Sequence, residues 1–240
     1  MIRVAVVDYG AGNLVSIGQG LAAVGASVTF ASSGAGLGGA DAMVVPGVGA
    51  AAPAMDRLRA QGLVEPIRHW ITDGRPYLGI CLGLQLLFDG SDEDGAETFG
   101  IVPGRTVLLE RAPTLPHIGW NQVEQRRRHA LFEGIPDGSD FYFVHSYAGR
   151  PAVGLTPADD PTPDDELSPA EELTLAETVH GGSFLSALAS GPLLGVQFHP
   201  ERSGPAGLRL LSNFVRIAAN AIPQRTPAAT AAPSVAGRPA

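Results

Sequence analysis

The most informative segment for predicting the fold is residues 76–83, Pro76-Tyr77-Leu78-Gly79-Ile80-Cys81-Leu82-Gly83. An apolar run over residues 76–80 leads directly into a helix-like run over residues 82–88, with Cys81 between them. Glycines two residues before and after the cysteine are typical of a strand-to-helix turn that is too sharp for side chains. We therefore predict a buried strand, a tight turn and a helix, with Cys81 at the turn.

The alternation of strand and helix continues on both sides of this stretch. The other strand-like runs are residues 3–8, 27–30, 42–46, 141–144 and 194–199, and the other helix-like runs are residues 14–24, 54–72 and 206–221. Several of the strands are nearly continuous in apolar residues, as strands covered on both faces are. Short strands and turns are expected over residues 100–189. The pattern predicts an α/β fold with one domain, residues 1–222, and a central, mostly parallel sheet flanked by helices.

The composition is that of a globular protein, because 45% of its 240 residues are hydrophobic and 17% are charged. No apolar run reaches the roughly 18 residues of a membrane span. The chain enters its first strand at once, so we expect no signal peptide and a cytoplasmic location. A single cysteine excludes an internal disulfide, and the absence of lysine excludes a Schiff-base or P-loop lysine. The net charge of −8 argues against a nucleic-acid surface.

The excess of acidic residues belongs to one segment. Residues 151–177 contain 8 acidic residues and no arginine, which leaves 16 acidic and 16 basic residues in the rest of the chain. Residues 151–172 are rich in Pro, Asp and Glu, and residues 223–240 are mainly Pro, Ala and Thr. Such segments bury too little apolar surface to offset their ordering entropy. We predict a disordered acidic insertion at residues 151–172 and a disordered tail at residues 223–240.

Three short motifs form a candidate catalytic site. Cys81 would present its sulfur at a helix N-terminus, where backbone dipoles favour the nucleophilic thiolate, although a buried structural cysteine is the alternative. His199 and Glu201 are separated by Pro200, which favours extended backbone, so the carboxylate can lie beside the imidazole and orient it. Residues 46–49, Pro-Gly-Val-Gly, end another strand, where glycines let backbone N–H groups approach a substrate. Parallel strands would bring all three motifs to one edge of the sheet.

These motifs resemble those of the class I (triad) glutamine amidotransferases, which have a flavodoxin-like α/β fold. The resemblance implies that L-glutamine is hydrolysed to glutamate and ammonia without a metal or organic cofactor. It implies that Cys81 is the nucleophile, that His199 is the general base and acid, and that Glu201 orients His199. The residues that match the oxyanion hole are Val48, Gly49 and Leu82, and those that match the substrate contacts are Gln85, Glu93, Ser146 and Tyr147.

Five stretches resemble one branch of this family, the glutaminase subunits of imidazole glycerol phosphate synthases. They are residues 8–14 (Asp-Tyr-Gly-Ala-Gly-Asn-Leu), 46–50 (Pro-Gly-Val-Gly-Ala), 116–121 (Pro-His-Ile-Gly-Trp-Asn), 143–147 (Phe-Val-His-Ser-Tyr) and 195–201 (Gly-Val-Gln-Phe-His-Pro-Glu). The resemblance implies a heterodimer with a separate (β/α)₈-barrel cyclase subunit that receives the ammonia. Residues that match the interface with this partner are Asn13, Trp120, Tyr142 and Arg202. The branch usually has lysine at the position of Arg202.

Two other interpretations stay open at this point. The chain would be the glutaminase of another synthase, such as that for anthranilate, guanylate or vitamin B6, or a catalytically inactive regulatory module on the same fold. Residues 116–121 favour the histidine-pathway branch, and the joint presence of Cys81, His199 and Glu201 argues against an inactive module. The histidines His69, His117, His129 and His180 show no ligand spacing, so no metal site is predicted.

Overall fold

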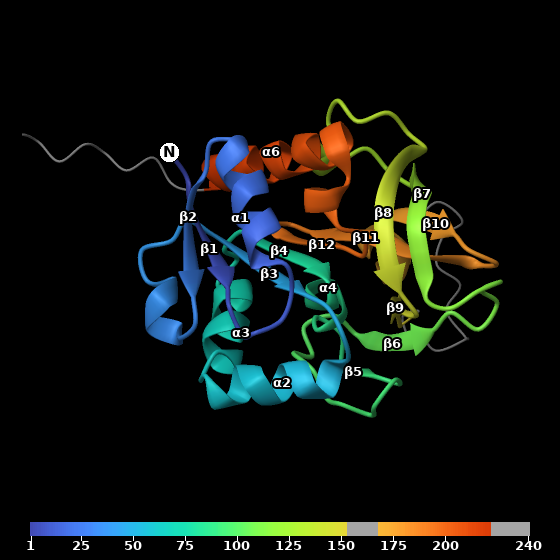
Figure 1. Ribbon diagram of the computed structural model, residues 1–240, viewed down its shortest axis with the longest axis horizontal. Coiled ribbons are helices and arrows are strands. Elements are labelled where there is room, and N and C mark those ends of the chain that lie inside the picture. The colour runs from blue at the N-terminus through green and yellow to red at the C-terminus, as the bar shows by residue number, and fades with distance from the viewer. Residues whose placement is uncertain (153–167, 222–240) are drawn as a thin grey trace, which may run out of the picture.

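The computed structural model describes residues 1–152 and 168–221 (Figure 1). Within these residues a nine-stranded sheet has the order β2-β1-β3-β4-β12-β11-β10-β7-β8, and a second, small sheet has the order β5-β6-β9. The large sheet consists of β1 (Arg3–Val7), β2 (Ser27–Ala31), β3 (Ala42–Gly47), β4 (Tyr77–Cys81), β7 (His117–Gln125), β8 (Ser139–His145), β10 (Thr174–Val179), β11 (Ser183–Ser190) and β12 (Leu193–Val196). The small sheet consists of β5 (Gly90–Ser91), β6 (Gly104–Leu108) and β9 (Tyr147–Pro151). The strands from β2 to β12 pair in parallel, as predicted, and the strands from β12 to β8 pair antiparallel.

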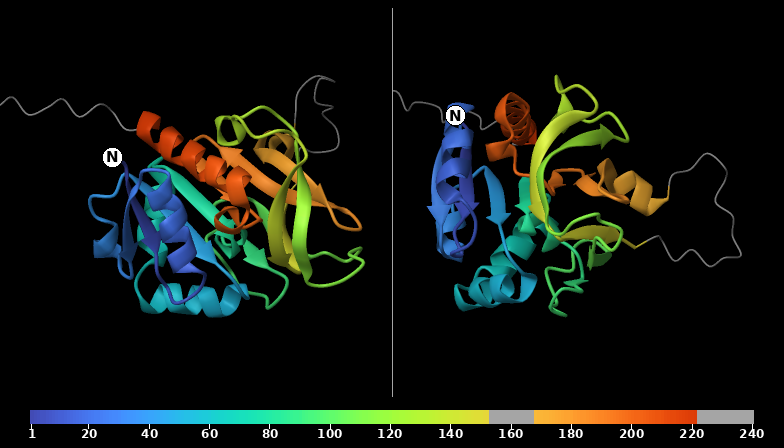
Figure 2. Two further views of the ribbon diagram at one scale, coloured as in Figure 1. Left: turned by 45° about the horizontal axis from the view of Figure 1, so that its top comes forward. Right: turned by 45° about the vertical axis from the view of Figure 1, so that its right-hand side comes forward.

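Helices cover both faces of the parallel half of the sheet. Helices α1 (Leu14–Ala23) and α6 (Gly204–Ala221) lie beside each other on one face, and α2 (Ala51–Ala60) and α3 (Val64–Thr72) cover the other (Figure 1, Figure 2). The shorter helical elements are α4 (Leu82–Gln85), α5 (Pro169–Leu173), η1 (Gly34–Leu37), η2 (Ala130–Phe132) and η3 (Pro200–Arg202). No helix in the described ranges is long and apolar enough to cross a membrane.

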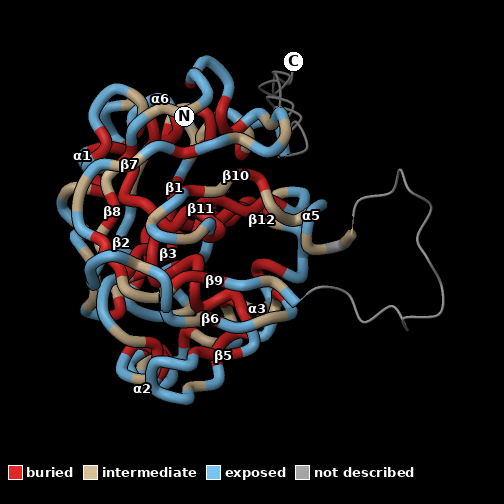
Figure 3. Tube along the Cα trace, turned by 90° about the vertical axis from the view of Figure 1, so that its right-hand side faces the viewer, coloured by how far each residue is buried: buried red, intermediate tan, exposed pale blue. Residues whose placement is uncertain are grey.

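Alternate residues of the central strands contribute to two separate cores. Val4 and Val6 of β1 pack in the core that contains residues of α1 and α6, whereas Ala5 and Val7 pack in the core that contains residues of α2 and α3. A strand between two layers of helix must be apolar on both faces, because successive side chains point to opposite sides. The continuous apolar runs in the sequence follow from this, and the same strands lie deepest in the molecule (Figure 3).

Three elements differ in length from the predictions. The single helix expected over residues 54–72 is two helices, α2 and α3, because the chain turns at Gly62, whose φ is +62°. Of the helix expected over residues 82–88, only Leu82–Gln85 (α4) is α-helical, and the chain continues to Phe88 in hydrogen-bonded turns. The last strand, β12, ends at Val196, so His199 lies three residues beyond the ladder.

The described ends of the predicted acidic insertion have regular secondary structure: Pro151 ends β9, and residues 169–172 lie in α5. Ser168 caps α5 by accepting from the Glu171 backbone N–H, while the Glu171 carboxylate accepts from the Ser168 N–H at 2.8 Å. This reciprocal capping satisfies backbone groups that would otherwise lack partners. The rest of the predicted insertion, residues 153–167, and the predicted tail, residues 223–240, lie outside the described residues.

Candidate active site

Cys81 is the last residue of β4 and has a strained backbone, with φ 54° and ψ −108°. A positive φ is uncommon for a residue with a side chain and costs about 1–3 kcal/mol. The flanking glycines make the turn possible: a Cβ at Gly79 would overlap the Gly83 carbonyl, and a Cβ at Gly83 would overlap the Val45 carbonyl. The structure therefore has the sharp turn that the glycine spacing predicts, and it leaves Cys81 4% exposed.

The order of three strands places the predicted motifs side by side. Strand β4 lies between β3 and β12, with Cys81 paired to Gly47 of β3. Val48 and Gly49 therefore follow β3 on one side of the cysteine, and His199 follows β12 on the other. Gly49 has a φ of +93°. All of these groups lie at the carboxyl edge of the parallel strands, where open α/β proteins hold ligands.

His199 is held by its backbone and by Glu201. Its N–H donates to the Tyr142 carbonyl at 2.8 Å, and its carbonyl accepts from Ser203 Oγ at 2.6 Å. Its ring Nδ1 lies 2.9 Å from Glu201 Oε1, and the Glu201 side chain is only 2% exposed. The other ring nitrogen, Nε2, is buried without a hydrogen-bond partner among the described residues. The ring therefore has one nitrogen fixed by a carboxylate and one free for proton transfer.

Electrostatics favour the charged form of this imidazole. Burial lowers the pKa of His199, but attraction to Cys81 and the hydrogen bond and charge of Glu201 outweigh it and raise the pKa to about 10. A histidine next to a cysteine and a carboxylate thus keeps its proton at neutral pH when the sulfur is a thiolate. This is the charge state that a Cys–His pair uses in nucleophilic catalysis.

Two glutamines join the cysteine to the Tyr147 backbone. Gln85 Nε2 donates to the Tyr147 carbonyl at 2.8 Å and to Gln197 Oε1 at 3.1 Å, and Gln197 Nε2 lies 3.5 Å from Cys81 Sγ. The predicted substrate residues Gln85 and Tyr147 are therefore brought together beside the cysteine. Sequence reasoning missed Gln197, although it stands two residues before His199 in a motif already singled out.

The chain matches a family model over residues 5–218, and that family is the class-I glutamine amidotransferases. The chain belongs to this family. Its relatives include proteins named imidazole glycerol phosphate synthase subunit HisH. That of Synechococcus sp. (strain JA-3-3Ab) is 44% identical over 92% of this chain and 97% of its own, and that of Dehalococcoides mccartyi (strain CBDB1) is 41% identical over 90% and 97%.

Solved structures show the same fold at lower identity. A structure described as a glutamine amidotransferase superposes with a TM-score of 0.66 at 18% identity, covering 90% of this chain and 98% of its own. A structure from Thermotoga maritima, described as PurLQS, superposes with a TM-score of 0.63 at 15% identity, covering 90% and 98%.

Three of the four predicted interface residues of this amidotransferase lie together. Trp120 of β7 is paired with Tyr142 of β8, their rings meet edge to face at 6.2 Å, and the Arg202 guanidinium lies 4.1 Å from the centre of the Tyr142 ring. Trp120 is 58% exposed, which is unusual for so large an apolar side chain. The fourth residue, Asn13, is exposed and accepts from the Ser16 N–H, so it also has a structural role as the N-cap of α1.

Two further predicted residues differ in how closely they join the site. Ser146 connects β8 and β9, and its carbonyl accepts from the Leu109 N–H at 3.0 Å. Glu93 is exposed on the loop after β5, and no hydrogen bond within the described residues joins it to Cys81, His199 or Glu201. Burial and the nearby Asp94 raise the pKa of Glu93.

Tyr9 is a residue of the site that sequence reasoning missed. Its side chain is buried, its hydroxyl has no hydrogen-bond partner among the described residues, and the hydroxyl lies against Gly47, in the space that a Cβ there would fill. Burial, followed by the nearby Cys81, raises the pKa of Tyr9, so the phenol keeps its proton. This phenol therefore lies beside Gly47, the β3 residue paired with Cys81, as a donor without an acceptor among the described residues.

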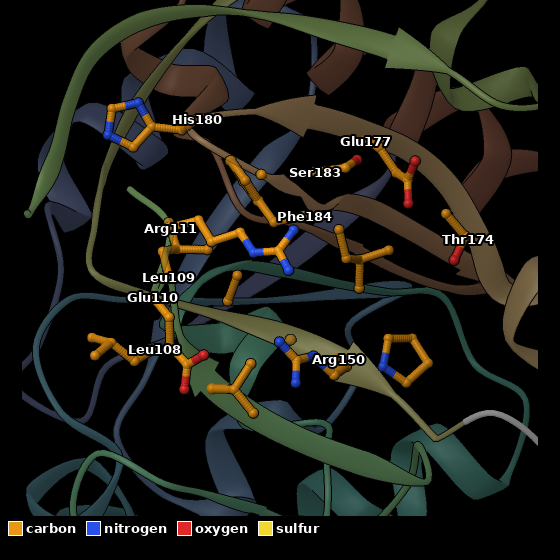
Figure 4. Close-up of a pocket in the computed structure, with 16 residues that line it drawn as sticks. Leu108, Leu109, Glu110, Arg111, Arg150, Thr174, Glu177, His180, Ser183 and Phe184 are labelled. Atoms are coloured by element: carbon orange, nitrogen blue, oxygen red, sulfur yellow. The ribbon is translucent and has the colours of Figure 1, made fainter. Parts of the chain in front are cut away.

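A separate cavity of about 480 Å³ lies away from this site, between β9, β11 and the residues that follow β6 (Figure 4). Arg111, Arg150 and His180 contribute polar atoms to its lining, and Cys81, His199 and Glu201 are not among the residues that line it. Its volume is therefore not evidence for where glutamine binds.

Proposed function

We propose that this amidotransferase is the glutaminase component of an imidazole glycerol phosphate synthase. In this proposal it hydrolyses L-glutamine and passes the ammonia to a separate (β/α)₈-barrel cyclase subunit, which makes imidazole glycerol phosphate and an aminoimidazole carboxamide ribotide. The convergence of Cys81, His199 and Glu201 at one sheet edge is the observation that carries it. The names of relatives at 41–44% identity support the choice of synthase.

The chemistry divides one difficult hydrolysis into two easier steps. The Cys81 sulfur attacks the carboxamide carbon of glutamine, and the tetrahedral intermediate collapses to a thioester as His199 protonates the departing ammonia. His199 then takes a proton from water, which attacks the thioester, releases glutamate and restores the cysteine. Glu201 holds the ring in one orientation and stabilises its positive charge, which fits the distance of 2.9 Å between them.

Backbone N–H groups would stabilise the oxyanion of each tetrahedral intermediate. Leu82 is the first residue of α4, so its N–H has no acceptor within the helix. The N–H of Val48, next to Gly49, lies at the neighbouring strand end, and its peptide would have to point toward Cys81 to donate. One such donor contributes about 3–4 kcal/mol, or a factor of roughly 10²–10³ in rate. Turning the Val48 N–H toward Cys81 would therefore change the rate by this factor.

The surface made by Trp120, Tyr142 and Arg202 is the proposed contact with the cyclase. Arg202 follows Glu201 directly, so a partner that contacts the guanidinium acts beside the triad. The arginine stacks on Tyr142, a contact for which a planar guanidinium is suited better than the ammonium group that the branch usually has.

Glutamate release, measured with and without the cyclase and its nucleotide substrate, tests the proposal. We expect low activity in the isolated chain, strong stimulation by the loaded partner, and none in Cys81→Ala. Arg202→Ala should weaken the complex or its stimulation, while synthesis from free ammonia stays intact. Full turnover by Cys81→Ala would exclude the chemistry, and an isolated chain as fast as the complex would exclude the coupling.

A further inference from the structure

The carbonyl oxygen of Tyr147 accepts hydrogen bonds from two polar side chains and thereby determines their orientation. Gln85 Nε2 lies 2.8 Å from this oxygen and His145 Nδ1 lies 2.9 Å from it. A carbonyl oxygen only accepts, so both nitrogens must carry the hydrogen that points to it. His145 is therefore protonated on Nδ1.

The proton on His145 Nδ1 determines the direction of the hydrogen bonds that lead away from Cys81, from His145 to His117 and Asn121. His145 is 7% exposed, and burial, followed by repulsion from His117, His199 and His180, outweighs the Tyr147 hydrogen bond and lowers its pKa to about 3. The ring is thus neutral, and its Nε2 is an acceptor. His117 Nδ1 lies 3.2 Å from that Nε2, across a direct pairing of β7 and β8, and must donate.

The chain of hydrogen bonds continues to the end of β7. Burial and the neighbouring His180 lower the pKa of His117 to about 4, so this ring is also neutral and its Nε2 accepts. The donor is Asn121 Nδ2 at 3.2 Å, whose second hydrogen goes to the Val179 carbonyl at 2.9 Å. Every donor on this side therefore meets an acceptor.

The Tyr147 carbonyl also determines the direction of the hydrogen bonds that lead toward Cys81. Gln85 Nε2 gives its second hydrogen to Gln197 Oε1 at 3.1 Å, which leaves Gln197 Nε2 as the group 3.5 Å from Cys81 Sγ. A donor at that position stabilises negative charge on the sulfur and holds the sulfur in place. Both glutamines are buried, at 6% and 0% exposed, so water does not compete for these bonds.

We propose that His117 and His145 are positioning residues: their hydrogen bonds hold the Tyr147 carbonyl in place, and this carbonyl orients Gln85 and Gln197 so that Gln197 donates to the Cys81 sulfur. The inference rests on the proposed role of Cys81 as nucleophile. It explains why nitrogen-bearing rings occupy a cluster that also packs by stacking: the His117 ring lies 4.9 Å from Phe143 and 4.1 Å from His180. A phenylalanine at position 117 would keep the stacking and lose the hydrogen bonds.

The tautomers are testable without any assay of activity. Nitrogen NMR of the full chain, labelled with ¹⁵N-histidine, distinguishes imidazole protonated on Nδ1 from imidazole protonated on Nε2. We expect both His117 and His145 to be neutral and protonated on Nδ1 at pH 7, against the usual preference for Nε2. Protonation of either ring on Nε2, or a charged ring at pH 7, overturns the chain of hydrogen bonds.

The effect on the sulfur is measured by alkylation. Cys81 is the sole cysteine, so the rate at which a small neutral alkylating agent modifies the protein reports on this sulfur alone. In His117→Phe and His145→Phe we expect the rate at pH 7 to fall about three- to tenfold, as expected for loss of one hydrogen bond. The kcat/KM for glutamine in the complex should fall by a similar factor. His145→Asn keeps a donor at the position of Nδ1 and should recover most of the loss.

His180→Phe is the matched control, because His180 stacks on His117 but donates outside the chain, to the Thr114 carbonyl at 3.0 Å. It should alkylate at the wild-type rate. Folded phenylalanine variants that alkylate at the wild-type rate overturn the proposal, as does a control that slows equally. If the phenylalanine variants do not fold, His145→Asn and the tautomers decide. Glutamine turnover by Cys81→Ala would instead refute the proposed function and leave the tautomer result unaffected.

Discussion

Acidification should destabilise this protein through two buried histidines. His117 and His145 have pKa values lowered to about 4 and about 3, mainly by burial. In the unfolded chain each titrates near 6.5. Below pH 6.5 the unfolded chain binds protons that the folded chain does not bind. The free energy of unfolding therefore falls as the pH falls toward the pKa values of the folded protein.

The size of the effect follows from these pKa values. Each unmatched proton changes the free energy of unfolding by about 1.4 kcal/mol per pH unit. Between pH 7 and pH 5 each histidine costs about 1.5–2 kcal/mol, and the pair about 3–4 kcal/mol, out of roughly 5–15 kcal/mol for a typical domain. His129, whose pKa is lowered by burial and by Arg127, acts in the same direction. His199 opposes this only slightly: its pKa is raised to about 10, so its stabilising effect grows as the pH falls from about 10 and is complete below about pH 6.5, which recovers roughly 0.8 kcal/mol between pH 7 and pH 5.

Urea denaturation at pH 7, 6 and 5, followed by tryptophan fluorescence, measures the effect. His117→Phe removes one of the two groups and keeps the stacking, so it should remove about half of the pH dependence. A free energy of unfolding that changes by less than about 1 kcal/mol between pH 7 and pH 5 would refute the reasoning. An undiminished slope in His117→Phe would show that the protons bind elsewhere.

Three further predictions concern the site itself. Glu201→Gln removes the charge beside His199 and should lower glutamate release in the complex about a hundredfold, less than Cys81→Ala does; equal losses in folded variants would contradict a purely orienting role. Gly83→Ala places a methyl group against the Val45 carbonyl and should destabilise the fold by about 3 kcal/mol, seen as a lower Tm, and an unchanged Tm would show that the elbow tolerates a side chain. Tyr9→Phe removes a buried hydroxyl without a partner among the described residues and should raise the free energy of unfolding by about 1 kcal/mol; a loss of stability would mean that the hydroxyl is bonded after all.

The pattern of apolar residues and glycines is sufficient to predict the parallel half of the fold and the turn at Cys81. Strands between two helical layers must be apolar on both faces, so runs such as Val4–Val7 are visible in the sequence. The glycines around Cys81 predicted a sharp turn, and the structure shows the reason at position 83, where a Cβ would overlap the Val45 carbonyl. The His199–Glu201 pair was predicted correctly, but its expected geometry was wrong: His199 is extended, as the following proline predicts, whereas Pro200 and Glu201 lie in η3, so a 3-10 turn brings the carboxylate beside the imidazole.

The partners of most polar groups in the site depend on the tertiary structure, whereas helix lengths depend also on local turns and caps. The break between α2 and α3 and the capping of α5 depend on turns and caps that apolar periodicity does not encode. The histidine cluster joins β7, β8 and the residue after β10, and Gln85 meets Gln197 across 112 positions of the chain. Such pairs are set by strand order and register, which no local pattern contains. His117 is an example: its position in the sequence shows no metal-ligand spacing or other motif, yet in the structure it lies in a continuous series of hydrogen bonds that reaches Cys81.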